Sequence, residues 1–439
     1  MRNKADMNNV RQSLHALDWM NFCMADMQMA IGAFVAIYLM SSRHWNPAQA
    51  GVVVAAQSIA TMLAQPSAGA LIDWSSHKKL IAAVGAGLVS VGTLLILFVP
   101  SLLLEILVQV LIGIAVSVFP PLLAAISLGI VGKARLPRRV GRNEMYNHSG
   151  KAVMALVAGA LAALFGQRWL FYTAVAFGIG ATVAALVIHD GDIDNQQARA
   201  AEVPDLTSPI VPGQAKSART YSMSELFQDR RIPIFLGSVI LFHFANACLL
   251  QLVTESLARG RDGQSSFYVS ACIIVAQCVM VPVAWVTARL TEGFGRKPLF
   301  LVCYLIVGLR ALLFAFGTGD WYLISVQSLD GVAAAIFGVL WTLINSDLAR
   351  GTGRFNFLQG AVASAWYLGA FLSNLAGGYL ANRLGFQTSF LCQAGIAAVG
   401  FLFFFLLMPE TKDSTRPQRA LARRIQGQAS EVSSENATA

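Results

Sequence analysis

Long apolar stretches recur twelve times along this chain of 439 residues, separated by short segments that carry glycine, proline or charge. A stretch of about 20 apolar residues can cross the hydrocarbon core of a bilayer as an α-helix, because a helix bonds all its backbone groups internally. The sequence therefore predicts twelve spans, at 17–41, 48–72, 80–99, 102–131, 147–165, 169–188, 232–257, 265–290, 298–317, 321–348, 358–382 and 387–408.

The composition also favours a membrane protein over a soluble one. Hydrophobic residues make up 56% of the chain and charged residues only 13%, whereas soluble domains carry about 25% charged residues. The six cysteines lie in apolar stretches, and none is spaced for a disulfide framework or a zinc site. We expect an all-α membrane protein embedded in a lipid bilayer, with no cofactor and no metal.

Lysine and arginine are unevenly distributed over the connections between spans. The connections on the side of the N-terminus carry more of them than those on the other side, as is typical of cytoplasmic loops. This distribution also explains the net charge of +9, so we expect no nucleic-acid partner and place both termini in the cytoplasm. The basic residues on the expected cytoplasmic side are Lys78, Lys79, Lys133, Arg135, Arg138, Arg139, Arg142, Arg296, Lys297, Arg350 and Arg354.

A polar segment separates the first six spans from the last six. Residues 190–231 contain few large apolar side chains, which predicts a disordered linker. Near its end we expect a short amphipathic helix with Ser222 or Ser224 as its N-cap. The chain then divides into a cytoplasmic N-terminus 1–16, a six-helix bundle 17–189, a cytoplasmic linker 190–231, a second bundle 232–408 and a cytoplasmic tail 409–439.

The two groups of spans resemble each other at a nearly constant offset of 218 to 220 residues. Several matches in the same order at one spacing indicate a duplication, which predicts two pseudo-symmetric six-helix bundles with a binding site between them near the membrane midplane. The matched pairs are Gln57 and Gln277, Asp73 and Glu292, Gln109 and Gln327, Gly113 and Gly331, Phe119 and Phe337, and Phe171 and Phe390.

Two connections in matching places carry an acid followed by a turn and two bases. The first reads GALIDWSSHKK at 69–79, and the second reads LTEGFGRKP at 290–298. Both resemble the signature G-x-x-x-D-[RK]-x-G-[RK]-[RK] of the major facilitator superfamily, although Trp74 and Ser76 replace a base and a glycine in the first copy. MPETK at 408–412 and QRWLF at 167–171 are similar to further segments of that superfamily.

This resemblance implies the twelve-helix fold of the superfamily and transport by alternating access. It also implies that the two motifs form a cytoplasmic gate, made by Asp73, Lys78, Lys79, Glu292, Arg296 and Lys297. Simple anchoring of the basic side chains at the membrane surface is the alternative for the lysines. Segments at 26–32, 141–143 and 351–356 resemble a bacterial subgroup with efflux-like members, which implies a location in the bacterial inner membrane.

Two departures from proton-coupled exporters leave the energy source open. Many of them carry an arginine four residues before a glycine in the fourth span, where this chain has Gln109 before Gly113. Drug antiporters have a fifth span rich in glycine and proline, but no proline lies between Gly150 and Gly166.

Three ionisable residues are expected inside spans, where a charge costs roughly 2.5–3.5 kcal/mol and suggests a function. Asp26, in the first span, is a candidate for binding a proton, a cation or a cationic substrate; a solvated carboxylate without a role is the alternative. Arg310 and Asp330 lie at similar depths in antiparallel spans, so we expect a buried ion pair, either structural or sensitive to protons. Glu105 lies near the outer end of its span, where we expect water to solvate it.

Polar residues in other spans are weaker candidates. His243 and Asn246 share the seventh span, and His243 either relays protons or makes an ordinary hydrogen bond. The glutamines either line a cavity or join helices, and they are Gln57, Gln109, Gln277 and Gln327. On the cytoplasmic side we expect a second gate between the halves, in which Asp347, Arg350 and Arg354 face Arg142, Asn143, His148 and Lys151; charge anchoring is the alternative.

We therefore expect a secondary active transporter of a small organic solute, monomeric and coupled to protons, with export favoured. The alternative within this class is an importer of a nutrient or a metal chelate, by symport or uniport. Outside it, the alternative is a membrane receptor or assembly component that does not transport. The chain has no G-x-S-x-G, H-E-x-x-H or GK[ST] loop, so we expect neither an enzyme nor an ATP-driven pump.

Overall fold

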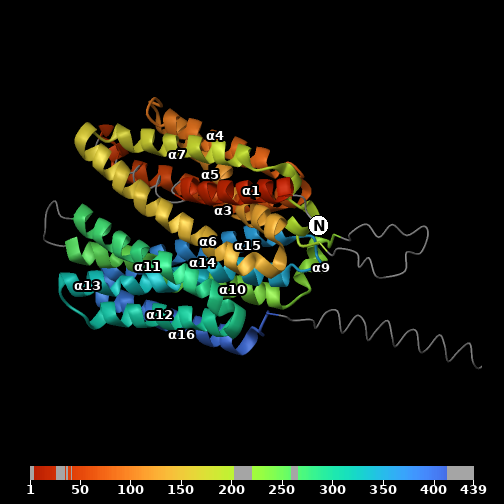
Figure 1. The fold of residues 1–439 in the computed structure, drawn as a ribbon. Coiled ribbons are helices and arrows are strands. Elements are labelled where there is room, and N and C mark those ends of the chain that lie inside the picture. The colour runs from red at the N-terminus through yellow and green to blue at the C-terminus, as the bar shows by residue number, and fades with distance from the viewer. Residues whose placement is uncertain are drawn as a thin grey trace, which may run out of the picture.

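Two groups of long helices lie side by side in the computed structural model, the first from the N-terminal part of the chain and the second from the C-terminal part (Figure 1). The structure describes residues 4–25, 35, 38–40, 42–201, 220–258 and 265–412. The described N-terminus and the segments that join the two groups lie at the same end of the helices, which we call the linker end (Figure 1).

Most helices follow the predicted spans, but α1 begins at Lys4, within the segment 1–16 that was predicted to precede the first span. The first half contains α1 (Lys4–Met24), α3 (Pro47–Trp74), α4 (Lys78–Leu95), α5 (Leu102–Val116), α6 (Phe119–Phe165) and α7 (Arg168–Val187). The second half contains α10 (Arg231–Ala258), α11 (Ser265–Phe294), α12 (Lys297–Phe316), α13 (Asp320–Val326), α14 (Ser328–Leu348), α15 (Phe355–Leu384) and α16 (Phe386–Leu407).

Among the described residues, eight stretches are long and apolar enough to cross a membrane. One of them, Leu102–Ala162, covers the expected fourth span and most of the fifth. Length and apolar composition alone therefore do not separate these two spans. α3 and α15 are not among the eight, and they pack against each other between the halves. A helix that faces protein rather than lipid can carry more polar and small residues.

The fourth and fifth spans meet at a sharp turn rather than at the long connection that the sequence predicts. Gly132 has φ +73°, and helical structure resumes directly after it. Ser127 and Asn143, on either side of Gly132, are hydrogen-bonded at 2.7 Å, although a straight helix would separate them by about 24 Å. The prediction of a loop at 132–146 was wrong, because the basic residues there occupy the exposed and paired faces of a helix.

The linker is more ordered than the sequence predicts. Residues 190–201 form a 3-10 turn (η1, Asp190–Asp192) and a short helix (α8, Asn195–Ala198), which Asp194 caps. Ser222 caps α9 (Met223–Phe227) in a capping box with Glu225, which confirms one of the two predicted caps. The prediction of disorder was therefore wrong for residues 190–201, while residues 202–219 lie outside the described part.

Segment 190–201 is held in place because it contacts both halves. Its Asp194 amide donates to Gly129 of α6 at 3.2 Å, and its Ala200 carbonyl accepts from the amide of Gly351, before α15, at 2.8 Å. Lys78 of α4 donates to Asn195 at 2.8 Å. The segment is therefore a structured bridge across the linker end.

Each half has its own apolar core. One cluster of buried residues lies within the first half, and the other fills the second half. Four residues of α6 belong to the second cluster, and they are Ala124, Leu128, Leu136 and Val140. The halves are thus separate packing units that meet along α6 and α3, and the polar residues at this meeting surface form the candidate site.

Candidate functional site between the halves

The carboxylate of Asp73, at the end of α3, binds the beginning of α15 in the opposite half. It accepts hydrogen bonds from the backbone amides of Asn356 and Phe357 at 3.1 and 2.8 Å, and from the Asn356 side chain at 2.8 Å. α15 begins at Phe355, so these amides are among the unpaired donors of its first turn. A buried carboxylate at the positive end of a helix is stabilised there, and it ties the halves together.

Glycines allow α3 and α15 to approach closely at the same place. A Cβ at Gly69 would lie 2.0 Å from the carbonyl oxygen of Asn356, and a Cβ at Gly360 would lie 2.1 Å from that of Gln65. Neither position can carry a side chain while the halves are in contact. The glycine that opens the first motif therefore permits this contact between the halves.

Replacing Gly69 by valine is expected to push the halves apart at the linker end by about 2 Å or more, since the new Cβ must retreat to ordinary contact distance. The distance between spin labels at Ser76 and Gly293, which are both exposed, measures this opening. Gly51→Val on the same helix is the matched control, because nothing lies within 4 Å of a Cβ there. Equal distances in the two variants would contradict the role of this contact.

Two ion pairs join α6 to the second half. Arg138 and Glu292 of α11 are 3.0 Å apart, and Lys133 and Asp347 of α14 are 3.2 Å apart. Asp347 also accepts from Arg296 at 3.1 Å. Two residues of the second motif are therefore involved. Glu292 contacts the opposite half directly, and Arg296 binds Asp347, which in turn contacts Lys133.

The predicted pairing of Asp347 and Arg354 with Arg142 and its neighbours was wrong. Asp347 pairs with Lys133 and Arg296 instead, and Arg354 donates to the Tyr221 carbonyl of the linker at 2.8 Å. Other predicted gate residues contact their own half or the linker: Lys78 contacts Ser75 and Asn195, Lys79 contacts Asp190, Lys297 contacts Glu410 and Phe405, and Arg142 contacts Asp18.

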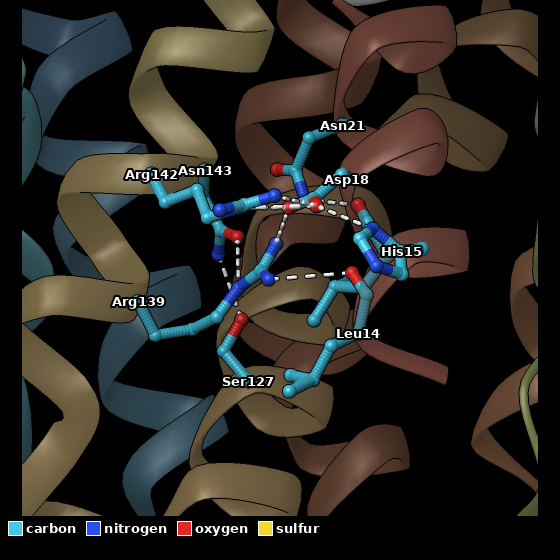
Figure 2. A network of polar contacts seen from close by, with 9 residues as sticks. Leu14, His15, Asp18, Asn21, Ser127, Arg139, Arg142 and Asn143 are labelled. Atoms are coloured by element: carbon cyan, nitrogen blue, oxygen red, sulfur yellow. Dashed lines mark hydrogen bonds and ion pairs between the residues drawn. The ribbon is translucent and has the colours of Figure 1, made fainter. Parts of the chain in front are cut away.

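A network within the first half fixes α1 to α6 (Figure 2). Asp18 of α1 is 2.7 Å from both Arg139 and Arg142 of α6, and its side chain is 2% exposed. Arg139 also donates to Asn143 at 2.7 Å, and Asn143 donates to Ser127 on the other side of the Gly132 turn. Asp18 thus neutralises a buried arginine while it joins three helical segments.

Near the middle of the interface, His148 of α6 contacts the opposite half. Its Nδ1 is 3.0 Å from Oε1 of Gln277 on α11, which places two predicted residues together. Glu144, one turn earlier, lies 3.6 Å from His148 Nε2. A Cβ at Gly338 of α14 would lie 3.0 Å from the Glu144 carboxylate. His148 and Glu144 of the first half therefore contact α11 and α14 of the second half.

An aromatic cluster in the second half includes two residues of α14, the helix that also carries Gly338. His243 of α10 stacks on Trp366 of α15 with ring centroids 4.4 Å apart, and contacts Phe337 of α14 edge to face at 4.8 Å. Trp341, one turn after Phe337, contacts Trp366 at 6.0 Å. His243 Nε2 has no hydrogen-bond partner in the described structure. In this structure the rings are buried, with Phe337 2%, His243 5% and Trp341 8% exposed. Aromatic faces can stack on a planar organic group where they become accessible.

Arg310 of α12 and Asp330 of α14 form the ion pair that the sequence predicts. The Arg310 side chain is 1% exposed. Asn246 of α10 accepts from Arg310 at 3.0 Å, and Gln327 donates to Asp330 at 3.3 Å. Four predicted site residues thus form one buried polar cluster in the second half.

The matching place in the first half has no charge. Gly92 and Ile112 stand 218 residues before Arg310 and Asp330. A Cβ at Gly92 would lie 2.6 Å from the Ile112 side chain, so these two residues are in direct contact. Since the fold makes the same helix contact with apolar residues, the ion pair is not needed for the packing itself.

The remaining candidates lie apart from these clusters or outside the described residues. Gln57 is buried in α3 beside Gly113 of α5. Gln109 donates to Glu105 at 3.1 Å, and Glu105 is 0% exposed, so the expected solvation of Glu105 was wrong. Asp26 lies outside the described residues.

Sequence reasoning missed Asp18 and Glu144 as site residues. Asp18 falls where the first span was expected to begin, and Glu144 falls in the expected loop before the fifth span. Helical spacing could have found Glu144, because Glu144, His148 and Lys151 share one face at intervals of four and three residues.

The model of the Major Facilitator Superfamily matches residues 18–292 and 286–434. The chain belongs to this superfamily. An uncharacterized MFS-type transporter of Mycobacterium tuberculosis is 38% identical over 399 residues, which cover 91% of this chain and 94% of that protein. The superfamily and its fold are those of transporters and not of enzymes, as the sequence predicts.

Solved transporters of the superfamily confirm the predicted fold. The proton:xylose symporter XylE bound to 6-bromo-6-deoxy-D-glucose aligns with a TM-score of 0.69 and 13% identity, over 92% of this chain and 97% of that chain. FucP in the outward conformation aligns with a TM-score of 0.64 and 13% identity, over 90% and 98%. The chain therefore has the superfamily's twelve helices in two bundles, and it is a multi-pass membrane protein that transports a small molecule.

Proposed function

We propose that this protein is a proton-coupled secondary transporter that exports a small organic solute from a bacterial cytoplasm by alternating access, and that it acts as a monomer in the inner membrane. The observation that carries the proposal is the contact surface between the halves. It combines breakable ion pairs and a helix cap at the linker end with ionisable residues in the middle of the interface.

The linker end is the cytoplasmic end in this proposal, and the structure represents the state that is closed there. The basic side chains of Lys133 and Arg138 lie at this end, in agreement with the bias of cytoplasmic segments towards lysine and arginine. The polar cross-half contacts at this end are hydrogen bonds and ion pairs, which water can replace when the halves separate. The predicted gate function of Asp73, Glu292 and Arg296 follows from this.

The substrate binds between Glu144 and His148 of the first half and the aromatic cluster of the second half. Glu144 packs against Gly338 of α14, one residue after Phe337 of that cluster. A solute with a flat apolar part and a polar group fits such a surface, because stacking and hydrogen bonding can act together. The aromatic surface and the efflux-like segments support export rather than nutrient uptake.

Flux into proteoliposomes with an imposed pH gradient tests this function. A panel of fluorescent or radiolabelled organic cations, neutral aromatic compounds and carboxylates is added to proteoliposomes that contain the protein in either orientation. We expect at least one solute to accumulate against its own gradient in the acidic compartment, because the solute and the proton move in opposite directions, and not after a protonophore is added. Absence of gradient-driven accumulation for every solute would contradict coupled transport and would favour a receptor or a uniporter.

Replacement of Asp26 by asparagine tests the predicted role of this carboxylate in the same assay. If Asp26 carries the coupling proton or pairs with a cationic solute, the variant loses most of its gradient-driven accumulation, about tenfold or more. Glu255→Gln is the control, because Glu255 is exposed near the end of α10. Unaltered accumulation by Asp26→Asn would remove Asp26 from the coupling mechanism.

A further inference from the structure

The hydrogen bond between His148 and Gln277 determines where the proton of the imidazole lies. Gln277 Oε1 is a carbonyl oxygen and can only accept, so His148 Nδ1 donates across the halves at 3.0 Å. In a neutral imidazole the other nitrogen, Nε2, then carries a lone pair and no hydrogen. The opposite half therefore selects the tautomer of His148.

The lone pair of Nε2 faces a carboxylate. Nε2 has no hydrogen-bond partner, and the Glu144 carboxylate lies 3.6 Å away. The His148 and Glu144 side chains are only 7% and 23% exposed, so little water is present to separate the two groups. An ionised carboxylate and a lone pair repel each other, whereas one added proton on either group turns the contact into an attraction.

The second half completes this proton site. Gly338 of α14 lies against the Glu144 carboxylate, and Gln277 of α11 fixes His148. Both contacts are lost when α6 separates from α11 and α14. His148 can then rotate, and water can hydrate Glu144 as an anion. The site thus exists only when the halves are in contact.

We propose that Glu144 and His148 share the coupling proton and hold it only while the linker end is closed. This inference rests on the proposed function and names the residues that couple it to protons. The proton enters from the side opposite the linker end and lies between Glu144 and His148 Nε2. Opening of the linker end breaks the His148–Gln277 bond and releases the same proton on that side, so no other reactant is required.

Other charged groups around α6 are either cationic or already paired. Lys151, on α6, is a cationic neighbour of both Glu144 and His148. The positive charge of Lys151 repels the imidazolium form of His148. This repulsion favours release of the proton when the site opens. The charged residues of neighbouring helices form pairs nearer the linker end, and these are Asp18 with Arg139 and Arg142, Glu292 with Arg138, and Asp347 with Lys133.

A pH titration of the distance between spin labels at Ser76 and Gly293 tests the proposal without any substrate. Because the closed state binds the proton more tightly, acid favours it and alkali favours opening. If the closed state prefers the proton tenfold, the ratio of closed to open molecules falls about tenfold from acid to alkaline pH. Glu144→Gln is expected to remove this dependence, while Glu255→Gln, on the exposed surface of α10, keeps it.

His148→Gln gives a second and independent variant in case Glu144→Gln does not fold, and it is expected to show the same loss of pH dependence. A titration in which either folded variant behaves as the wild type would overturn the proposal. In the flux assay, a wild type without gradient-driven transport would refute the proposed function. A wild type that responds to the gradient, with Glu144→Gln responding equally, would refute the Glu144–His148 site alone.

Discussion

Replacing Asp18 by asparagine is expected to destabilise the protein by about 3–5 kcal/mol, because it leaves a buried arginine without its counter-ion. Arg139 is 4% exposed and depends on Asp18, which it contacts at 2.7 Å. Arg142 loses its contact with the same carboxylate. Thermal unfolding in detergent measures the effect, and the expected fall in Tm is roughly 6–20 °C for a half of this size.

Asp190→Asn is the matched control for Asp18→Asn. Asp190 forms an ion pair with Lys79 at 2.9 Å, but its side chain is 53% exposed. Exposed pairs contribute only about 0–1 kcal/mol, so the Tm should fall by no more than a few degrees. Similar shifts for Asp18→Asn and Asp190→Asn would show that the network in Figure 2 is not a structural anchor.

Replacing Asp330 by isoleucine is expected to destabilise the second half by about 3–5 kcal/mol, since Arg310 would be left unpaired and buried. Adding Arg310→Gly should restore most of that loss. The double variant reproduces the contact between Gly92 and Ile112 that the first half makes in the matching place, less about 1 kcal/mol for a glycine inside a helix. The Tm values of the single variant and of the double variant measure the loss and its recovery.

Transport separates a structural from a functional role for this pair. We expect the double variant to fold, because the same packing without charge already serves the first half. We expect it to lose gradient-driven transport, because it lacks the two charges. A double variant that transports normally would show that the pair has no function. A double variant as unstable as Asp330→Ile would show that the packing of the two halves differs at this place.

The sequence predicts the long helices well because their apolar length is a local property. The halves and their order follow from the repeat, and the contact of Arg310 with Asp330 follows from the depth of each residue in antiparallel helices. The first motif also locates the Asp73 contact, because an acid at a helix end needs donors, and the first turn of a neighbouring helix supplies them.

The partners of charged residues are much harder to predict, because they depend on tertiary packing. Lys133 was expected to anchor a loop but pairs with Asp347 across the interface, and Arg142 pairs with Asp18 of its own half. Both follow from the turn at Gly132, which continues the fifth span as a helix through residues that look like a basic loop. A single glycine with a positive φ has no clear signal in an apolar sequence.

The order of residues 190–201 was hidden for a related reason. Their composition is polar, and a polar segment has no apolar face that would predict packing. The segment is held by hydrogen bonds, such as those from Lys78 to Asn195 and from Asn356 to the Ala198 carbonyl, and by burial of the apolar side chains of Ile193 and Ala198 in the core of the first half.

Alternating access is the central claim, and paired distances at the two ends of the helices test it most directly. Spin labels at Ser76 and Gly293 report the linker end, and labels at Ser101 and Thr318, which are also exposed, report the opposite end. We predict that conditions that lengthen the first distance, such as alkaline pH or Gly69→Val, shorten the second. If both distances change in the same direction, or if the opposite end stays unchanged while the linker end opens, the halves do not rock against each other and the account is wrong.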